Sequence, residues 1–431
     1  MRISRYALVI LLLLFVTGTY AHTDNQDAFT KRLPAPEVKI LSISDHLYDG
    51  EFEAAEAELN ALIAEHPDFR LAHLVYAELM RAKSGMVPGF SNWINPKNSE
   101  LASLVDEIRR RHAHQREASY AKGKIPDFLL QMSPSQKRVV VVDSNLSRAH
   151  IFENTNNQLS LVDDFYITVG ENGVLKNTEG DGKTPIGVYF ITSRLDPLGL
   201  DDLYGDGALP LNYPNEWDQR MGRSGFGIWL HGVPSNTYNR APFATQGCVA
   251  FPNDDISLLY NTPDIENTPV IITQRVNWVD KTQNSLYQLS LSKQIEAWRN
   301  DWEDGNMKKI SRYYSNSFSN GNSNRNAWLK AQNTLFTQPG SNKFELSDMS
   351  MFKYPGTQRM AVVSFNKEYE TDIASERRRI RQYWYLDNND AWRIVYEGLA
   401  EYQPIHFKGI PNAVRPTLAD EIQHGNKSLG S

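Results

Sequence analysis

The chain has 431 residues, a formal net charge of −6 and 41% hydrophobic residues. This length exceeds one ordinary hydrophobic core, so we expect about two or three domains, and the composition excludes a largely disordered chain. No basic stripe dominates the sequence, which argues against nucleic acid as a partner.

Residues 1–21 have the pattern of a secretory signal peptide. Arg2 and Arg5 precede an apolar run from Tyr6 to Val16, and Thr19-Tyr20-Ala21 offers small residues for cleavage. The run has 11 residues, whereas a helix that spans a bilayer needs about 20. We therefore expect an exported, periplasmic protein with no stable membrane span after signal cleavage.

Residues 37–122 have helical periodicity and are expected to form a helical module. Ala55, Leu59 and Leu62 recur at helical spacing, and Pro67 breaks the helix that they define. A G-x-F-x-x-A pattern with a later proline resembles one tetratricopeptide repeat, although a packed helical hairpin is an equal alternative. One such unit leaves an apolar face open. We expect it to pack on a neighbour, on a second copy in a homodimer, or on a protein partner.

A further helix is expected from Asn98 to Tyr120. Its many charges between Asp106 and Arg111 predict a solvated face. His112 and His114 are two positions apart, so on a helix they point in different directions and predict no metal pair. Because the sequence also lacks an HExxH motif or a carboxylate–histidine cluster, we expect neither a metal nor a cofactor.

Residues 126–276 change to short apolar runs separated by turn residues. Many short strands with few helices predict a β-sandwich or an open barrel. The expected strands lie at residues 138–142, 150–152, 165–169, 188–191, 226–230 and 270–273.

The stretch from Gly225 to Asn253 contains the only cysteine of the chain, Cys248. A thiol with a pKa of about 8.5 is mostly protonated near neutral pH unless a base or a positive charge assists it. His231 follows the apolar run Phe226–Leu230 and is positioned to be that base. A lone cysteine cannot form an internal disulfide, which favours a free reactive thiol after export. The alternative is a small buried cysteine beside a histidine in a structural turn.

Residues 196–223 form a long segment with little periodicity and several aromatic residues. A loop of this length inside a compact domain is usually functional or mobile. We expect a lid beside Cys248, with an ordinary surface excursion as the alternative. Tyr213 and Trp217 in this segment, together with Thr245, are the candidate substrate-binding residues.

Two motifs in this region carry a family resemblance. His231-Gly232, a loop, and Thr245-Gln246-Gly247-Cys248-Val249 resemble the signature of the YkuD-type L,D-transpeptidases, in which HG precedes S/T-x-G-C. The run from Gly180 to Tyr189 resembles the TP-x-G segment of the same family, and the likeness extends over residues 137–273. The TQGC form is more similar to the cell-shape L,D-carboxypeptidases of helical bacteria.

The sequence departs from the family pattern at two positions. Gln246 stands where most relatives have histidine, and Ala250 stands where they have arginine or asparagine. The first departure removes a second imidazole near the thiol, and the second removes a possible anchor for substrate. Both departures count against cross-linking activity.

The resemblance implies a peptidoglycan enzyme that acts on stem peptides. Cys248 and His231 would be catalytic, and the backbone at Gln246, Gly247 and Gly232 would stabilise an oxyanion. Cys248 would attack the carbonyl between the L-centre of diaminopimelate and the terminal D-alanine. Water would then resolve the thioester in a carboxypeptidase, or an amine would do so in a transpeptidase. A different thiol hydrolase and a non-catalytic wall-binding protein are the remaining alternatives.

Residues 286–404 are expected to form a separate α+β domain. Helices at 289–300 and 307–314 precede strands at 360–369, 381–386 and 392–398. The W-x-x-x-W-x-x-G-N pattern that begins at Trp298 resembles the SnoaL-like cone domains, which enclose a pocket. No convergent acid and base are visible here, so we expect a binding or dimerising role. The chain as a whole is thus expected to be multidomain: helical module, β-rich catalytic sandwich and α+β cone.

Overall fold

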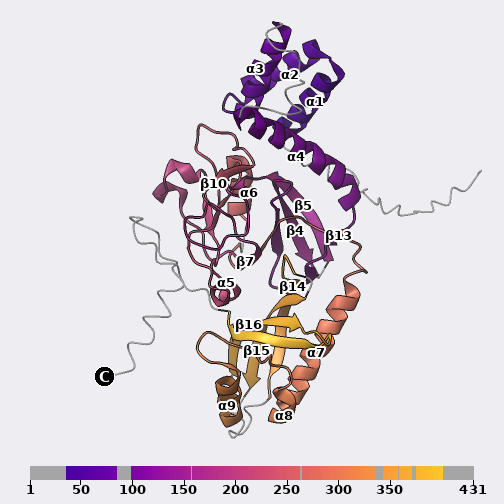
Figure 1. The fold of residues 1–431 in the computed structure, drawn as a ribbon, viewed down its shortest axis with the longest axis vertical. Helices are drawn as coiled ribbons and strands as arrows, with labels where there is room; N and C mark the ends of the chain where they lie inside the picture. Colours follow the sequence, from indigo (N-terminus) through magenta and orange to yellow (C-terminus); the bar gives the residue numbers. More distant parts are fainter. Residues whose placement is uncertain are drawn as a thin grey trace, which may run out of the picture.

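The computed structural model describes residues 35–84, 99–156, 158–262, 265–335, 343–357, 359–370 and 375–400. Figure 1 shows three parts in succession along the long axis: a helical module in indigo, a β-rich domain, and an α+β domain in orange and yellow. The expected signal peptide lies outside the described residues. None of the helices in the described ranges is long and apolar enough to cross a membrane.

Four helices form the N-terminal module: α1 (Ala35–Asp49), α2 (Phe52–Glu65), α3 (Arg70–Lys83) and α4 (Ser99–Ala121). The residues that predicted the helical period are buried in its core, including Ala55, Leu59 and Leu62, with Ile108 of α4 added to them. Tyr238 from the β-rich domain covers part of this core. The tetratricopeptide-like identity and the homodimer or partner contact stay predictions.

The solvated face predicted for α4 is present at Arg109, which is exposed, but the prediction is wrong for Glu107 and Arg111. Glu107 and Arg111 are only 5% and 2% exposed, and their side chains pair at 2.7 Å. Arg111 also pairs with Glu37 of α1 at 3.1 Å, and His114 reaches Asp164 of the β-rich domain at 2.8 Å. Charged side chains are buried when they find partners. Glu107 and Arg111 pair within α4, but Glu37 and Asp164 come from other elements, so the spacing of charges along α4 does not reveal them.

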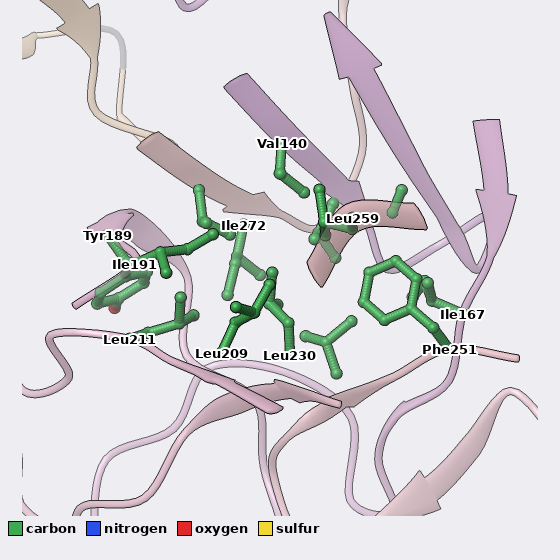
Figure 2. Close-up of a cluster of buried hydrophobic side chains, with 14 of the residues drawn as sticks. Val140, Ile167, Tyr189, Ile191, Leu209, Leu211, Leu230, Phe251, Leu259 and Ile272 are labelled. Atoms are coloured by element: carbon green, nitrogen blue, oxygen red, sulfur yellow. The ribbon is translucent and has the colours of Figure 1, made fainter. Parts of the chain in front are cut away.

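The β-rich architecture expected for residues 126–276 is confirmed. A five-stranded sheet has the order β5-β4-β3-β12-β7, and a three-stranded sheet has the order β11-β9-β8. The first contains β3 (Arg138–Asp143), β4 (Arg148–Thr155), β5 (Gln158–Tyr166), β7 (Gly187–Phe190) and β12 (Pro269–Thr273), and the second β8 (Ala208–Pro210), β9 (Trp229–His231) and β11 (Val249–Ala250). Val140 and Ile272 from the first sheet meet Leu209 and Leu230 from the second in one core (Figure 2).

Smaller elements complete this domain. The pair β6 (Val169–Gly170) and β10 (Phe243–Thr245) lies beside the three-stranded sheet, and α6 (Asn253–Tyr260) follows β11. Two short strands pair with each other and join the beginning of this segment of the chain to its end: β1 (Ile125–Pro126) and β13 (Trp278–Val279).

Two expectations in this domain are wrong. The strand expected at 226–230 begins only at Trp229, because Gly225 and Gly227 adopt φ values of +100° and +74° that interrupt an extended chain, and Phe226 is 60% exposed. The segment 196–223 does lie beside Cys248 through Leu200 and Tyr204, as expected, but it is not a separate lid. It contains the strand β8, which pairs with β9, and the helix α5 (Glu216–Arg220).

The C-terminal domain has the expected α+β layout. Helices α7 (Ser285–Glu303), α8 (Met307–Ile310) and α9 (Arg325–Leu335) accompany strands β14 (Glu345–Lys353), β15 (Met360–Glu370), β16 (Ser375–Leu386) and β17 (Trp392–Leu399). The strand β2 (Leu129–Gln131), which precedes the first strands of the catalytic sheet, pairs with β14 and becomes the edge of the C-terminal sheet. The two domains therefore share backbone hydrogen bonds.

Candidate active site

Parallel pairing of β9 with β11 brings His231 and Cys248 to the same region. In this register Val249 lies opposite Leu230, and Ala250 lies opposite His231. Val249 and Leu230 point into the core, so the alternating positions Trp229, His231 and Ala250 occupy the other face. Cys248 comes directly before β11 and packs beside Trp229 on that face. Two residues distant in sequence thus share one face of a small sheet.

Tyr204 is an aromatic residue that the sequence did not single out as functional, and its ring contacts those of Trp229 and His231. Its ring is 4.8 Å from the ring of Trp229 and 5.3 Å from that of His231, which it meets edge-on. Tyr204 also contacts the small apolar cluster that holds Cys248. No motif marks this tyrosine, because it belongs to the segment before β8 and reaches the site only through the fold.

The Cys248 thiol is protonated in the free protein. Burial raises its pKa to about 11, against the opposing effects of the Trp229 backbone N–H and of the charges of Lys176 and Arg240. The thiol donates a hydrogen bond to the carbonyl oxygen of Gly227 at 3.2 Å. Among the described residues no hydrogen bond joins it to His231. The expected role of His231 as the base stays a prediction, and the thiol that it would deprotonate is neutral at rest.

His231 is a neutral base with a defined tautomer. It is 3% exposed, and burial lowers its pKa to about 4 although a hydrogen bond to the Gly232 backbone opposes the shift. Its Nδ1 lies 2.6 Å from the carbonyl oxygen of Gly232. A carbonyl only accepts, so Nδ1 carries the proton and Nε2 keeps its lone pair. This lone pair can accept a proton at any pH well above 4.

The turn before Cys248 is shaped by two threonines. Thr245 Oγ1 accepts from the Gly247 N–H at 3.1 Å and donates to the Cys248 carbonyl at 2.7 Å, while Thr184 Oγ1 donates to the Gly247 carbonyl at 2.9 Å. Gly247 has φ of +129°, and a Cβ there would lie 2.7 Å from the carbonyl oxygen of Lys183. Only glycine fits at position 247. The Thr245 hydroxyl, which was expected to bind substrate, is bonded to the backbone of the turn.

Two of the expected oxyanion donors are already occupied. The Gly247 N–H is bonded to Thr245, and the Gly232 N–H donates to the carbonyls of Tyr204 and Gly207 at 2.8 and 3.2 Å. The remaining amides near the sulfur belong to Gln246, whose side chain is exposed, and to Cys248 itself. Of the three expected oxyanion donors only the Gln246 amide is left, and we add the Cys248 amide as a candidate.

Tyr213 and Trp217 do not occupy positions that support the expected role in substrate binding. Tyr213 is 1% exposed in the domain core, and its hydroxyl donates to the carbonyl of Ser224 at 3.0 Å. Trp217, on α5, stacks on Tyr383 of β16 with ring centroids 5.8 Å apart. The neighbouring Glu216 accepts from Arg381 at 2.9 Å. These aromatic residues hold the core and the junction with the C-terminal domain.

The C-terminal domain buries a lysine, Lys367, that the sequence pattern does not reveal. Lys367 is 5% exposed and lies 4.0 Å from the ring of Phe344 and 4.5 Å from that of Trp302. Burial lowers its pKa to about 8, with Glu397 acting in the opposite direction. Lys367 does not stand out in the sequence, because Asn366 and Glu368 beside it are also polar.

Candidate metal ligands do not cluster in the part of the chain that the structure describes. His112 contacts Ser44 Oγ at 2.8 Å, and His114 is paired with Asp164. Each of the two histidines thus has a partner of its own.

Comparison with known families assigns the two larger domains. Residues 137–272 match YkuD, the L,D-transpeptidase catalytic domain, and residues 290–398 match the Cds6 C-terminal NTF2-like domain. The chain therefore carries an L,D-transpeptidase catalytic domain of the YkuD type, followed by an NTF2-like, or SnoaL-like, domain.

Several solved structures are similar to part of this chain. Bd1075 from Bdellovibrio bacteriovorus is 26% identical, with a TM-score of 0.55, and the match covers 64% of this chain and 99% of that one. The helical cell shape determining protein Pgp2 from Campylobacter jejuni is 21% identical, with a TM-score of 0.54, and the match covers 63% and 95%. A point mutant of Pgp2 is 22% identical, with a TM-score of 0.53, and the match covers 65% and 96%. No curated protein sequence is significantly similar to this chain.

Proposed function

We propose that this protein is a periplasmic L,D-carboxypeptidase that removes the terminal D-alanine from peptidoglycan stem tetrapeptides. The observation that carries the proposal is the pairing of β9 with β11, which sets Cys248 and the neutral base His231 on one face of an L,D-transpeptidase catalytic domain. The arginines and apolar run at the N-terminus support export. The similarity to Pgp2 supports a role in cell shape.

In the proposed mechanism the thiol is deprotonated only as it attacks. Cys248 Sγ forms a bond to the carbonyl carbon between diaminopimelate and D-alanine, and its proton passes to Nε2 of His231. With pKa values of about 11 for the thiol and about 4 for the imidazole, a preformed ion pair is unfavourable, so transfer accompanies attack. A positioned base of this kind contributes about 10² to 10⁴ in rate.

The second half of the reaction releases both products. Collapse of the tetrahedral adduct breaks the C–N bond, and His231 returns its proton to the leaving D-alanine amine. The oxyanion would be stabilised by the amides of Gln246 and Cys248, each worth about 3 kcal/mol. Water then adds to the thioester, its proton passes to His231 and on to the departing sulfur, and the tripeptide leaves with a new carboxylate.

Water is favoured over an amine as the group that resolves the thioester. An amine acceptor has to be bound and held deprotonated, which costs ordering entropy that water avoids. Ala250 lies opposite His231 in the strand pair and carries no polar group, and Gln246 takes up no proton near neutral pH. L,D-transpeptidation is the second candidate, since the matched catalytic domain is named for that activity.

The proposal is tested by product analysis. The purified protein is incubated with a stem tetrapeptide, with and without a diaminopimelate-containing acceptor, and the products are identified by mass spectrometry. We expect tripeptide and free D-alanine in both reactions and none from Cys248→Ala. Mostly cross-linked dimers would establish the transpeptidase, and cleavage at another bond a different hydrolase. No product with any stem peptide would leave a wall-binding protein.

A further inference from the structure

The loop between His231 and Cys248 is held by the N-terminal helical module. The Tyr238 ring packs 4.7 Å from the ring of Phe69 and 5.1 Å from that of His66, both in the connection between α2 and α3. The Tyr238 N–H donates to the Asp68 carbonyl at 3.2 Å. The helical module is therefore in direct contact with the segment that joins the two proposed catalytic residues.

Buried polar groups fix the next two residues of the loop. Asn239 Nδ2 donates to Glu107 Oε1 of α4 at 2.8 Å, and both side chains are buried. The Tyr166 hydroxyl donates to the Arg240 carbonyl at 3.0 Å. The first bond holds the side chain of Asn239, and the second holds the carbonyl group of Arg240, so the backbone at Arg240 has a defined position.

A pocket of about 630 Å³ lies where this loop meets the module. Arg70, Leu71 and Leu74 of α3 form one wall, Glu107 of α4 contributes to the lining, and Thr237 and Arg240 belong to the loop. The pocket is thus closed by two parts of the chain, and residues of the helical module form a wall of it.

Of the two arginines that line this pocket, Arg70 and Arg240, Arg240 belongs to the loop between His231 and Cys248. It is half-buried, and no ion pair or side-chain hydrogen bond of its guanidinium occurs among the described residues. The acidic residues of the lining do not neutralise it: Glu107 is bonded to Arg111 and Asn239, and Asp68 forms no ion pair with it. Its charge acts on both Cys248 and His231. A partly desolvated guanidinium without an anion favours an anionic ligand.

We propose that Arg240 binds the terminal carboxylate of the stem tetrapeptide and that the junction pocket receives this end of the peptide. The inference rests on the proposed function. An enzyme that removes a terminal residue has to distinguish a chain end, and the free carboxylate beside the scissile bond is the feature that defines it. A guanidinium matches a carboxylate in shape and charge. Ala250 offers no such group, so the anchor comes from the loop.

The test separates binding from chemistry. In a Cys248→Ala background, calorimetry measures the affinity for a stem tetrapeptide with a free terminal carboxylate and for the same peptide with a terminal amide. We expect the amide to bind about 10- to 100-fold more weakly, as for loss of a charged hydrogen bond. Adding Arg240→Gln should weaken the acid by a similar factor and change the amide less than twofold, while Arg240→Lys restores part of the affinity.

Arg194→Gln is the matched control. Arg194 lies in the same domain outside the pocket, pairs with Glu266 at 3.2 Å, and should leave both affinities unchanged. The inference is overturned if Cys248→Ala binds the peptide acid and the peptide amide equally well. It is also overturned if adding Arg240→Gln weakens the binding of both peptides by the same factor. If the unsubstituted protein releases D-alanine while either result is found, the inference fails and the proposed function stands. If it releases none and Cys248→Ala binds neither peptide, both fail.

Discussion

The Nδ1 atom of His231 lies 2.6 Å from the carbonyl oxygen of Gly232, the residue that follows it. This contact fixes the tautomer, because a carbonyl accepts only from a protonated nitrogen. The position of Gly232 is itself fixed, since its N–H is bonded to Tyr204 and Gly207 and a Cβ there would collide with Asn253 Oδ1. His231 is oriented by backbone and has no acidic side chain bonded to its ring in the described residues.

Cys248→Ala should abolish D-alanine release and change the free energy of unfolding by less than about 1 kcal/mol. Cys248 as a residue is partly exposed, and its thiol donates only one weak hydrogen bond, so little packing is lost. Product analysis and urea unfolding measure the two effects. Retention of most activity would rule out the thiol mechanism.

The rate of Cys248 alkylation by iodoacetamide should rise about tenfold per pH unit until the pH reaches the pKa near 11. The rate for an ordinary thiol levels off near pH 8.5. Burial disfavours the thiolate, which is the reactive form. A cysteine-containing peptide in the same buffers is the control. A plateau at or below pH 8.5 would contradict the neutral pair.

His231→Ala should lower kcat by about 10² to 10⁴ while the alkylation profile keeps its high midpoint. In this structure the histidine is neutral and is not bonded to the sulfur, so removing it takes away a proton acceptor rather than a stabilising charge. Steady-state kinetics and alkylation together check this. A shift of the alkylation midpoint in the variant would mean that His231 does stabilise the thiolate.

Protonation of His231 should make the protein less stable in mild acid. Its folded pKa of about 4 lies below the ordinary 6.5, so between these values the unfolded chain binds the proton and the folded chain does not. Stability is present above pH 6.5 and declines as the pH falls toward 4, by at most about 3 kcal/mol. His231→Gln should flatten this part of the pH dependence in urea titrations. His114, whose pKa is raised by Asp164 against its burial, acts in the opposite direction and remains in both proteins.

Tyr238→Ala should reduce kcat/KM at least tenfold, because the loop loses its packing on Phe69 and His66 and the residues beside it lose their fixed positions. The unfolding free energy should fall by about 1–3 kcal/mol. Tyr238→Phe keeps the ring and is the control, expected to behave as the native protein. Equal activity in all three proteins would show that the contact with the helical module does not position the loop.

Trp217→Ala should lower stability by about 2–4 kcal/mol and leave KM for the tetrapeptide within twofold. The ring stacks on Tyr383 at the domain junction and not beside Cys248. Thermal unfolding and steady-state kinetics measure the two effects. A large rise in KM with unchanged stability would restore Trp217 as a substrate-binding residue.

Several features of this protein follow from the sequence alone. The HG and TQGC motifs identify the family of the catalytic domain, because the turn at Gly247 and the close approach at Gly232 tolerate no other residue and so leave a local signature. The period of Ala55, Leu59 and Leu62 predicts a helix with one buried face, and the order of helices and strands predicts the α+β layout of the last domain. Each of these is a local property of backbone geometry or of one element's own buried face.

The chemical state of the site was decided only by the tertiary structure. Periodicity indicates which face of an element is buried but not what covers it, so α4 appeared solvated although Glu107 and Arg111 have buried partners. In the same way Tyr204 carries no motif, and it contacts Trp229 and His231 from the segment before β8. The pKa values of Cys248 and His231 depend on desolvation by residues far away in sequence. The sequence therefore predicted the two residues of the candidate site, and the fold places them on one face of a small sheet, where burial favours the neutral form of each.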